Sequence, residues 1–237
     1  MQNTGYVTLT RQSGLMREMQ VVANNIANAA TTGYRQEGLV FSEFVKRVEH
    51  GPSLSMAAAN ARNTSMMQGA LTKTGSSFDF AIEGEGFFLI ETPAGERLTR
   101  SGSFSPNAAG ELVTVDGHRV LDAGGAGIFV PPDVGDIAVS SDGTLSADGR
   151  LLGQIGLVVP TDPSGLMRED GVMFRADAGI NPALDGQILQ GFLENSNVDP
   201  IGQVARMIEI QRAYEMGQSF LDAENERLRS ALKTFVK

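Results

Sequence analysis

The chain has 237 residues, of which 41% are hydrophobic and 20% charged, a composition typical of a folded protein and incompatible with general disorder. It contains no cysteine, which excludes a disulfide framework, a thiolate metal site and a cysteine nucleophile. Residues 76–195 contain 18 acidic residues and six arginines. This acidic middle argues against a nucleic-acid partner, because it offers no basic face to displace counterions.

Residues 1–35 are predicted to be the N-terminal helix of an assembly domain, with the helix itself running from about Thr4 to Ala30. Its opening shows neither the basic nor the apolar segment of a cleaved signal peptide, and no apolar run in the chain approaches the roughly 18 residues of a membrane span. The positions of an a/d heptad pattern are Leu9, Met16, Met19, Ala23 and Ile26, with Gln12 as the polar exception. We expect the helix to end at Thr31-Thr32-Gly33, where the glycine can adopt a left-handed cap conformation.

Residues 36–75 are predicted to form an extended connector, because the stretch from Ser53 to Met67 is small and polar and has no sustained period. Residues 76–195 are predicted to form one antiparallel β domain. Their short runs rich in Val, Ile and Phe are separated by Asp-Gly dipeptides, which favour tight turns with positive φ.

Residues 196–237 repeat the helical pattern more strongly. Asp199-Pro200 is expected to begin the helix as the capping residue and the first helical position. The heptad positions include Met207, Ile210, Tyr214, Leu221 and Leu228. The predicted fold class is therefore α+β, a discontinuous domain of long N- and C-terminal coiled-coil helices with a central antiparallel β domain.

Two narrow apolar seams at the ends of one chain indicate assembly, since such seams usually pair with helices of other chains. The alternative is a helical hairpin within one chain that lies on the sheet. Asn24, Asn25 and Asn28 leave a similar choice open. Their amides could bond to neighbouring backbones in an assembly, or they could end the helix early, and the pattern alone slightly favours the second interpretation.

Three segments carry a family resemblance. Residues 21–35, Val-Val-Ala-Asn-Asn-Ile-Ala-Asn-Ala-Ala-Thr-Thr-Gly-Tyr-Arg, resemble the N-terminal motif of the flagellar basal-body rod and hook proteins. Residues 82–88 with 99–104 are similar to the beginning of that family's β domain, and residues 194–198 with 207–215 are similar to its C-terminal motif. The opening of residues 6–12 and the modest length are most similar to proximal-rod subunits. Distal-rod subunits are usually longer, and hook subunits carry a further domain.

The resemblance implies a structural subunit that polymerises through its terminal helices into a tube, transmits torque and passes exported subunits. It implies a rod location across the periplasm, export through the flagellar type III apparatus without a cleaved signal, and partners that are copies of itself and other rod proteins. Carried over to this chain, the assembly residues are Asn24, Asn25, Asn28, Gly33, Tyr34, Asn195, Asn197, Gln211, Tyr214 and Glu215. The seam positions Leu9, Met16, Met19, Ile26, Met207, Ile210, Leu221 and Leu228 complete the predicted assembly set.

The residues give little support to an enzyme. His50 and His118 have no metal-ligand partner at helical spacing. Ser230-Ala-Leu-Lys233 matches a serine acyl-transferase motif only in a heptad helix, without the other motifs of that class. The Gly-rich segments lack the following helix that a phosphate site needs. No catalytic residue, metal or cofactor is therefore predicted. The non-enzymatic alternative is a secreted adhesin or ligand-binding β module.

Overall fold

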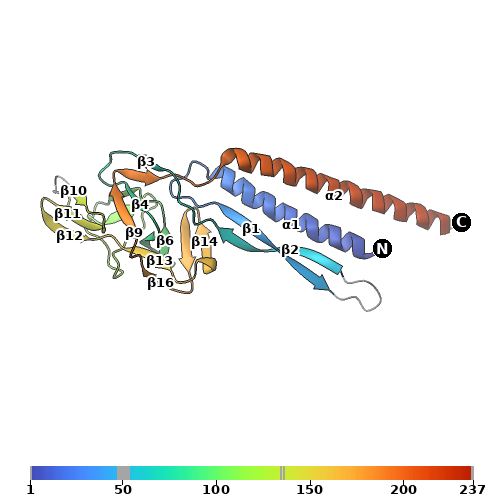
Figure 1. Ribbon diagram of the computed structural model, residues 1–237, viewed down its shortest axis with the longest axis horizontal. Helices are drawn as coiled ribbons and strands as arrows, with labels where there is room; N and C mark the ends of the chain where they lie inside the picture. Colours follow the sequence, from blue (N-terminus) through green and yellow to red (C-terminus); the bar gives the residue numbers. More distant parts are fainter. Residues whose placement is uncertain (1, 47–53, 134, 136, 236–237) are drawn as a thin grey trace. The chain divides into compact units, whose positions relative to one another are not determined.

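The computed structural model describes residues 2–46, 54–133, 135 and 137–235 of the chain. It is an α+β protein: along the chain, a long helix is followed by antiparallel sheets and then by a second long helix (Figure 1), so the predicted class is confirmed at that level. The chain divides into two compact units. Unit 1 comprises Met1–Ala27, Glu37–Ser65 and Asp199–Lys237, and unit 2 comprises Asn28–Gln36 and Met66–Val198.

Unit 1 is built from two helices and one hairpin. The helices are α1 (Gln2–Ala27) and α2 (Pro200–Phe235), and the hairpin consists of β1 (Glu37–Lys46) and β2 (Leu54–Thr64). The helices run antiparallel, because Gln12 bonds to Gln218 near one end and Asn25 bonds to Gln203 near the other, each at 3.2 Å. The start of α1 and the end of α2 therefore lie at the same end of unit 1 (Figure 1).

The helix boundaries follow the capping residues only in part. Asp199 accepts a hydrogen bond from the Ile201 amide at 3.1 Å, as expected for the start of α2. Helix α1 ends at Ala27, earlier than predicted, where the Asn28 carbonyl accepts from the Thr31 amide at 3.1 Å in a turn. Gly33 does have a positive φ of 70°, but it lies beyond the helix, so the predicted glycine cap was wrong.

Regular strands occupy much of the segment that lacked a sequence period. Strands β1 and β2 pair antiparallel from Glu37 with Thr64 to Lys46 with Leu54, with one irregularity between Val40 and Phe41. Pairing with a distant partner strand creates this hairpin, so the small polar residues of the second strand gave no local signal. The sequence analysis expected an extended connector here and did not predict that residues 37–64 form a hairpin.

Unit 2 contains the remaining strands, and every strand pair among the described residues is antiparallel. The main sheet has the order β14-β15-β6-β5-β9-β8-β7, with β13 joining β5 and β16 joining β13. The other sheets are β10-β11-β12, β17-β4 and β18-β3. The strand bounds are β3 (Leu71–Lys73), β4 (Phe80–Glu83), β5 (Phe87–Thr92), β6 (Gly95–Thr99), β7 (Phe104–Pro106), β8 (Leu112–Thr114), β9 (Arg119–Val120), β10 (Ile137–Val139), β11 (Thr144–Ala147), β12 (Arg150–Gln154), β13 (Leu157–Pro160), β14 (Leu166–Asp170), β15 (Met173–Ala176), β16 (Ile180–Pro182), β17 (Gln187–Gln190) and β18 (Phe192–Glu194).

The core of unit 2 forms on both sides of strand β5. Phe88 and Ile90 point into one buried cluster, whereas Phe87 and Leu89 point into another, as the two-residue period of a strand requires. Burial on both faces explains why this strand appears in the sequence as a continuous apolar run. Four of the predicted Asp-Gly turns place their glycine at positive φ, namely Gly117, Gly143, Gly149 and Gly171.

Candidate assembly site

The predicted seam of α2 packs against α1 within the same chain. Ile210 is 2% exposed, and Met207, Tyr214 and Leu221 are half-buried on the same side of the helix. Leu228, further along the predicted seam, is 41% exposed. The hairpin alternative therefore accounts for most of this seam.

The predicted seam of α1 is divided in the structure. Gln12, Met19 and Ile26 are buried or half-buried, whereas Leu9 and Met16 are 55% and 44% exposed. The reason is that α1 packs on α2 along one side and on the β1–β2 hairpin along another. These contacts rotate the Leu9–Met16 edge toward solvent.

Asn25 joins α1 to the hairpin of unit 1. Its side-chain amide donates to the Glu37 carbonyl at 2.8 Å and accepts from the Glu37 amide at 3.0 Å, so a 1% exposed side chain satisfies two backbone groups. Asn24 on the same helix is exposed. On α2, Gln211 and Glu215 are exposed and bond to each other at 3.2 Å.

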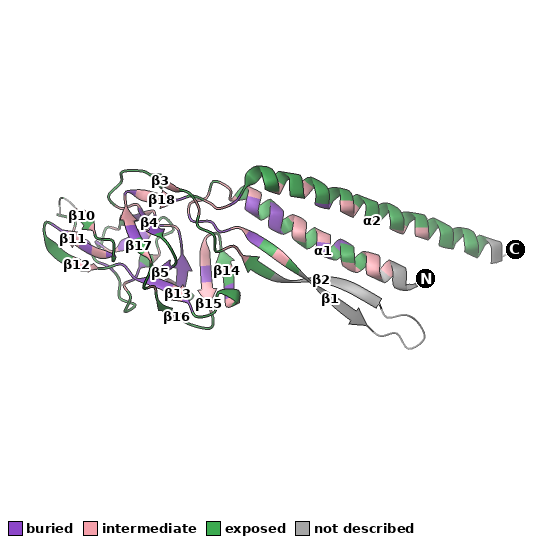
Figure 2. Cartoon of the chain, in the orientation of Figure 1, coloured by how far each residue is buried: buried purple, intermediate pink, exposed green. Residues whose placement is uncertain are grey.

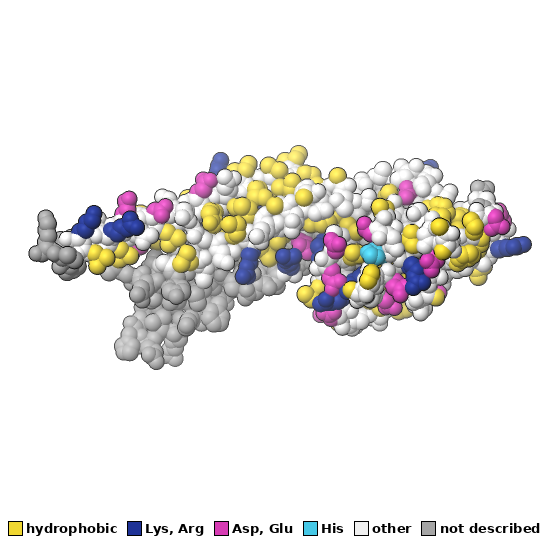
Figure 3. All heavy atoms as spheres, turned by 180° about the vertical axis from the view of Figure 1, so that it is seen from behind, with side chains coloured by type: hydrophobic (Ala, Val, Ile, Leu, Met, Phe, Trp, Pro, Cys, Tyr) yellow, Lys and Arg dark blue, Asp and Glu magenta, His cyan; other side chains and the backbone are white. Residues whose placement is uncertain are grey.

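Unit 1 leaves much apolar surface uncovered. Figure 2 shows that most of α2 is exposed, and Figure 3 shows hydrophobic side chains along the helical part of the molecule. Exposed large hydrophobic residues of the two helices are Leu9, Met16, Ile201, Val204, Ile208, Met216, Phe220, Leu228 and Leu232. Apolar surface of this extent on paired helices is typical of a contact with another protein chain.

A groove of about 380 Å³ separates α1 from α2 on one side of this pair. The residues that line it include Gln12, Leu15, Met216, Gly217 and Phe220. Gly217 contributes no side chain, so the two helices leave room there. The groove is mainly apolar and open to solvent.

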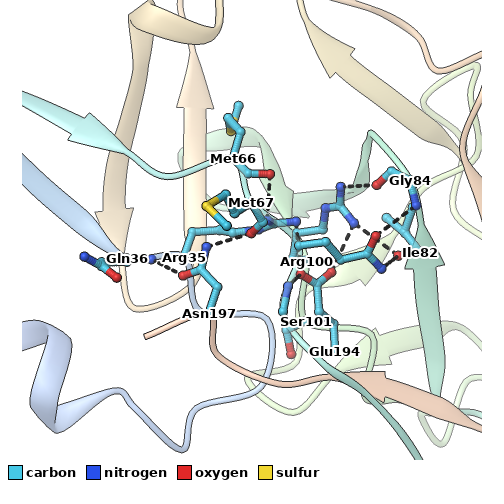
Figure 4. A network of polar contacts seen from close by, with 12 residues as sticks. Arg35, Gln36, Met66, Met67, Ile82, Gly84, Arg100, Ser101, Glu194 and Asn197 are labelled. Carbon is cyan, nitrogen blue, oxygen red and sulfur yellow. Dashed lines mark hydrogen bonds and ion pairs between the residues drawn. The ribbon is translucent and has the colours of Figure 1, made fainter. Parts of the chain in front are cut away.

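Unit 2 contains a buried cluster of three charged side chains (Figure 4). Glu194 lies between Arg35 and Arg100, with ion pairs of 3.0 Å to each, and all three side chains are at most 3% exposed. Arg100 also donates to the carbonyls of Ile82 at 3.2 Å and Gly84 at 2.7 Å. Arg35 donates to the Met66 carbonyl at 2.9 Å. The cluster therefore ties together three distant parts of the sequence.

Burial dominates the electrostatics of this cluster. Removal from water lowers the pKa of Arg100 to about 10, and repulsion by Arg35 acts in the same direction, while Glu194 opposes both. Burial likewise lowers the pKa of Arg35, again opposed by Glu194. One carboxylate therefore faces two buried guanidinium groups in this cluster.

The segments of unit 2 that lead to the two helices are bonded side by side. The Gly33 amide donates to the Glu194 carbonyl at 2.7 Å, and the Asn197 side chain accepts from the Gln36 amide at 2.6 Å. Tyr34 is 2% exposed, and the guanidinium of Arg168 lies 4.3 Å from the centre of its ring. We call the residues Gly33–Gln36 and Glu194–Asn197, together with Arg100, the junction clamp.

The structure thus distributes the predicted assembly residues over both units. Gly33, Tyr34 and Asn197 meet in the junction clamp, whereas the heptad positions lie in unit 1. Asn28 precedes the clamp, and Asn195 bonds to Thr72 at 2.9 Å. The charged cluster was not predicted from the sequence. Its members Arg35, Arg100 and Glu194 fall one in each of the three family-like motifs, and this distribution of charged residues was the signal that could have indicated it.

The residues considered for catalysis are dispersed. His118 lies in the turn between β8 and β9, Ser230 and Lys233 lie on α2, and His50 is outside the described residues. Among described residues, no three His, Asp or Glu side chains are grouped as a metal site would require. In the part of the chain that the structure describes, no helix combines the length and hydropathy needed to cross a membrane.

Comparison with protein families gives three matches in chain order. Residues 6–35 match the family described as flagella basal body rod protein, residues 81–147 match the flagellar hook protein FlgE/F/G D1 domain, and residues 189–234 match the flagellar basal body rod FlgEFG protein C-terminal family. The three residues of the buried cluster fall one in each match.

Curated relatives cover nearly the whole chain. The flagellar basal-body rod protein FlgF of Caulobacter vibrioides is 40% identical over 100% of this chain and 99% of its own length, and FlgF of Mesorhizobium japonicum is 38% identical over 99% and 98%. FlgG of Bacillus subtilis is 30% identical over 94% of this chain and 95% of its own length. These FlgF proteins are thus more similar to the chain than this FlgG is.

Paired helices with exposed apolar faces, joined to an antiparallel β unit, define a structural subunit of a larger protein assembly. The chain belongs to the flagellar basal-body rod protein family. It is most like FlgF. It is therefore a structural subunit of the flagellar rod, and not an enzyme. The predictions of a rod subunit and of a non-enzymatic role are confirmed by these comparisons.

Proposed function

We propose that the chain polymerises through unit 1, with α1 and α2 forming part of the wall of a tube. The single observation that carries this proposal is the row of uncovered apolar side chains on both helices, among them Ile201, Val204 and Ile208 at 83%, 47% and 46% exposure. Covering such side chains is favourable by about 25 cal/mol for each Å² removed from water. Residues 1–35 and 196–237 would then act as one discontinuous, coiled-coil assembly domain.

The junction clamp supports this function from inside unit 2. We propose that it fixes the spacing of the segments that lead to α1 and α2, so that both helices are available to neighbouring subunits together. Gly33, Tyr34 and Asn197 would then serve assembly by positioning the chain. Residues 76–195 would act as the β domain outside the tube.

We further propose a proximal-rod position, which the higher identity to FlgF relatives supports. The partners would be copies of this chain and other rod proteins, and the rod would cross the periplasm, transmit torque and provide a channel for later subunits. Export would use the flagellar type III apparatus without a cleaved signal. These expectations follow from the family to which the chain belongs.

The test is Ile208→Asp, expressed in a strain that lacks the native gene. We expect the variant to stop rod assembly, because a carboxylate would be buried in an apolar contact without a partner. Electron microscopy of basal bodies and a swimming assay measure the result. The matched control is Val115→Asp, since Val115 is 83% exposed in unit 2. Normal rods and motility in the Ile208→Asp strain would refute assembly through this helix face.

A further inference from the structure

A pocket of about 270 Å³ in unit 2 is lined by both arginines of the buried cluster. The side chains that line it also include Met66, Phe87 and Val159, which are apolar. Met66 is 41% exposed, whereas Arg35 and Arg100 are 1% and 3% exposed. The pocket therefore joins the surface of unit 2 to the buried guanidinium groups.

The two guanidinium groups have donors that the described part of the chain does not use. A guanidinium carries five N–H groups, and Arg100 donates three hydrogen bonds, to the Ile82 and Gly84 carbonyls and to Glu194 (Figure 4). Among the described residues, Nε of Arg100 and both Nε and Nη2 of Arg35 have no hydrogen-bond partner, although Nη2 lies 3.0 Å from Oε1 of Glu194. Buried N–H groups are normally paired with protein, water or a ligand, so these donors are available to a bound molecule.

The lining residues indicate the chemistry of that molecule. One carboxylate serves two guanidinium groups in the cluster, and a planar carboxylate matches the donor geometry of arginine. Glu85 also lines the pocket and is exposed. Its negative charge opposes a doubly charged phosphate more than a singly charged carboxylate. The apolar lining residues are suited to a hydrocarbon chain attached to the carboxylate.

We propose that this pocket binds a carboxylate carried on a short hydrocarbon chain. The carboxylate accepts hydrogen bonds from Arg35 and Arg100, and the hydrocarbon chain packs on Met66, Phe87 and Val159. The ligand is a free organic acid or the side chain of a glutamate from a neighbouring protein chain. This inference goes beyond the proposed polymerisation and does not depend on it, because all lining residues belong to unit 2.

A tryptophan placed in the pocket tests the proposal, because the native chain contains no tryptophan. The full-length Met66→Trp variant is titrated with sodium butyrate at pH 7 and constant ionic strength. We expect a saturable change in fluorescence, with weaker binding of acetate by roughly fourfold for each CH₂ group that acetate lacks. Butanamide, which is neutral, should give no change. Val115→Trp, at an 83% exposed position of unit 2, should not respond to butyrate.

A second pair of variants leaves the arginines in place, because replacing Arg100 would also disturb the fold around the cluster. Glu85→Gln should tighten butyrate binding by about two- to fivefold, the range typical of one exposed charge. Glu83→Gln is the matched control, since Glu83 is exposed and outside the lining residues, and should leave the dissociation constant unchanged. Isothermal titration calorimetry measures butyrate binding to these variants and to the native chain.

Four results would overturn the inference. They are no saturable response to butyrate by either method, equal responses to butyrate and butanamide, equal affinities for acetate and butyrate, and tighter binding of inorganic phosphate than of butyrate. The first would leave water as the partner of the arginines. The second would remove the role of their charge, the third that of the apolar residues, and the fourth would indicate a site for a doubly charged anion.

The same measurement on the polymer distinguishes the two sources of the carboxylate. If Met66→Trp in the polymer responds to butyrate as it does in the free chain, the natural ligand is a free acid. If its fluorescence already equals the butyrate-bound value and no longer responds, a neighbouring chain supplies the carboxylate. A chain that binds butyrate but never polymerises would refute the proposed function and support the pocket assignment.

Discussion

The buried cluster of Arg35, Arg100 and Glu194 shows how much one residue can control in unit 2. A single carboxylate faces two guanidinium groups, and each contact is 3.0 Å. The cost of burying these charges is offset only while the carboxylate is ionised and in place. The cluster thus holds β18 and the segment before β1 against the residues that follow β6.

We expect Glu194→Gln to lower the free energy of unfolding of unit 2 by about 3–5 kcal/mol, because two buried cations lose their counterion. Urea unfolding, monitored by a spectroscopic signal from the strands of the core, measures this change. Glu91→Gln is the control, since Glu91 pairs with Arg119 at a site where both side chains are more than 40% exposed, and should cost about 1 kcal/mol or less. Similar losses for the two variants would contradict the role of the cluster.

Gly33 is constrained by both backbone and space. Its φ is 70°, and a Cβ at this position would lie 2.3 Å from the Ser101 amide nitrogen. We expect Gly33→Ala to destabilise unit 2 by clearly more than Gly117→Ala. Gly117 also has a positive φ, but a Cβ there would meet no atom within 4 Å, so that control incurs only the backbone strain of about 1–2 kcal/mol. Equal melting temperatures would show that the clamp relaxes around the added methyl group.

The arginine partners of Glu169 make the stability of unit 2 depend on pH. Hydrogen bonds from Arg97, and secondarily from Arg175, lower the pKa of Glu169 below its usual 4.5. The stabilising contribution is present above the unfolded pKa and is lost as the pH falls through the folded pKa. We expect the Glu169→Gln variant to have a lower melting temperature than the native protein at pH 7. The difference between the two melting temperatures should shrink as the pH falls below about 4.5. A difference independent of pH would contradict this assignment.

At the scale of elements, the packing of unit 1 depends on where glycine occurs in α2. Gly217 is in the helix interior, and a Cβ there would meet the Gln12 side chain at 3.4 Å, an ordinary contact. Gly202 differs, because a Cβ would approach Oδ2 of the capping residue Asp199 to 2.6 Å. Within one helix, an added Cβ is therefore accommodated at Gly217 but crowds the capping residue at Gly202.

We expect Gly217→Ala to raise the unfolding free energy of unit 1 by up to about 1 kcal/mol, since alanine favours the helix by that amount. Thermal melting at 222 nm, where α1 and α2 contribute most of the signal, measures the change. Gly202→Ala should give no such gain, because it disturbs the hydrogen bond from Ile201 to Asp199. A loss of stability in Gly217→Ala would show that the helices are closer than ordinary contact allows.

At the scale of the whole molecule, the two units differ in how much of their surface is buried by other parts of the same chain. Unit 2 has a buried core on both sides of β5, whereas α2 of unit 1 is mostly exposed (Figure 2). Backbone hydrogen bonds in a solvent-exposed helix open locally at low cost. The monomer should therefore be least protected along α2.

We expect hydrogen exchange to be fast in the last turns of α2 in the monomer and markedly slower in the polymer, because neighbouring chains cover the helix there. Strand β5 should be protected in both states and serves as the internal control. Mass spectrometry of the two forms, compared peptide by peptide, measures the change. Unchanged exchange along α2 on polymerisation would contradict a role for this helix in assembly.

The sequence by itself determined the two long helices, the strand-rich middle and the start of α2, because heptad spacing, Asp-Gly turns and an Asp-Pro cap act over a few residues. The family-like motifs also identified the class of protein. Only the tertiary structure decided which residues of the α1 seam are buried and which are exposed, and that residues 37–64 contain a hairpin, since both depend on partners far along the chain. It also brought Arg35, Arg100 and Glu194 together: burial of charge is set by packing, and no local pattern records it.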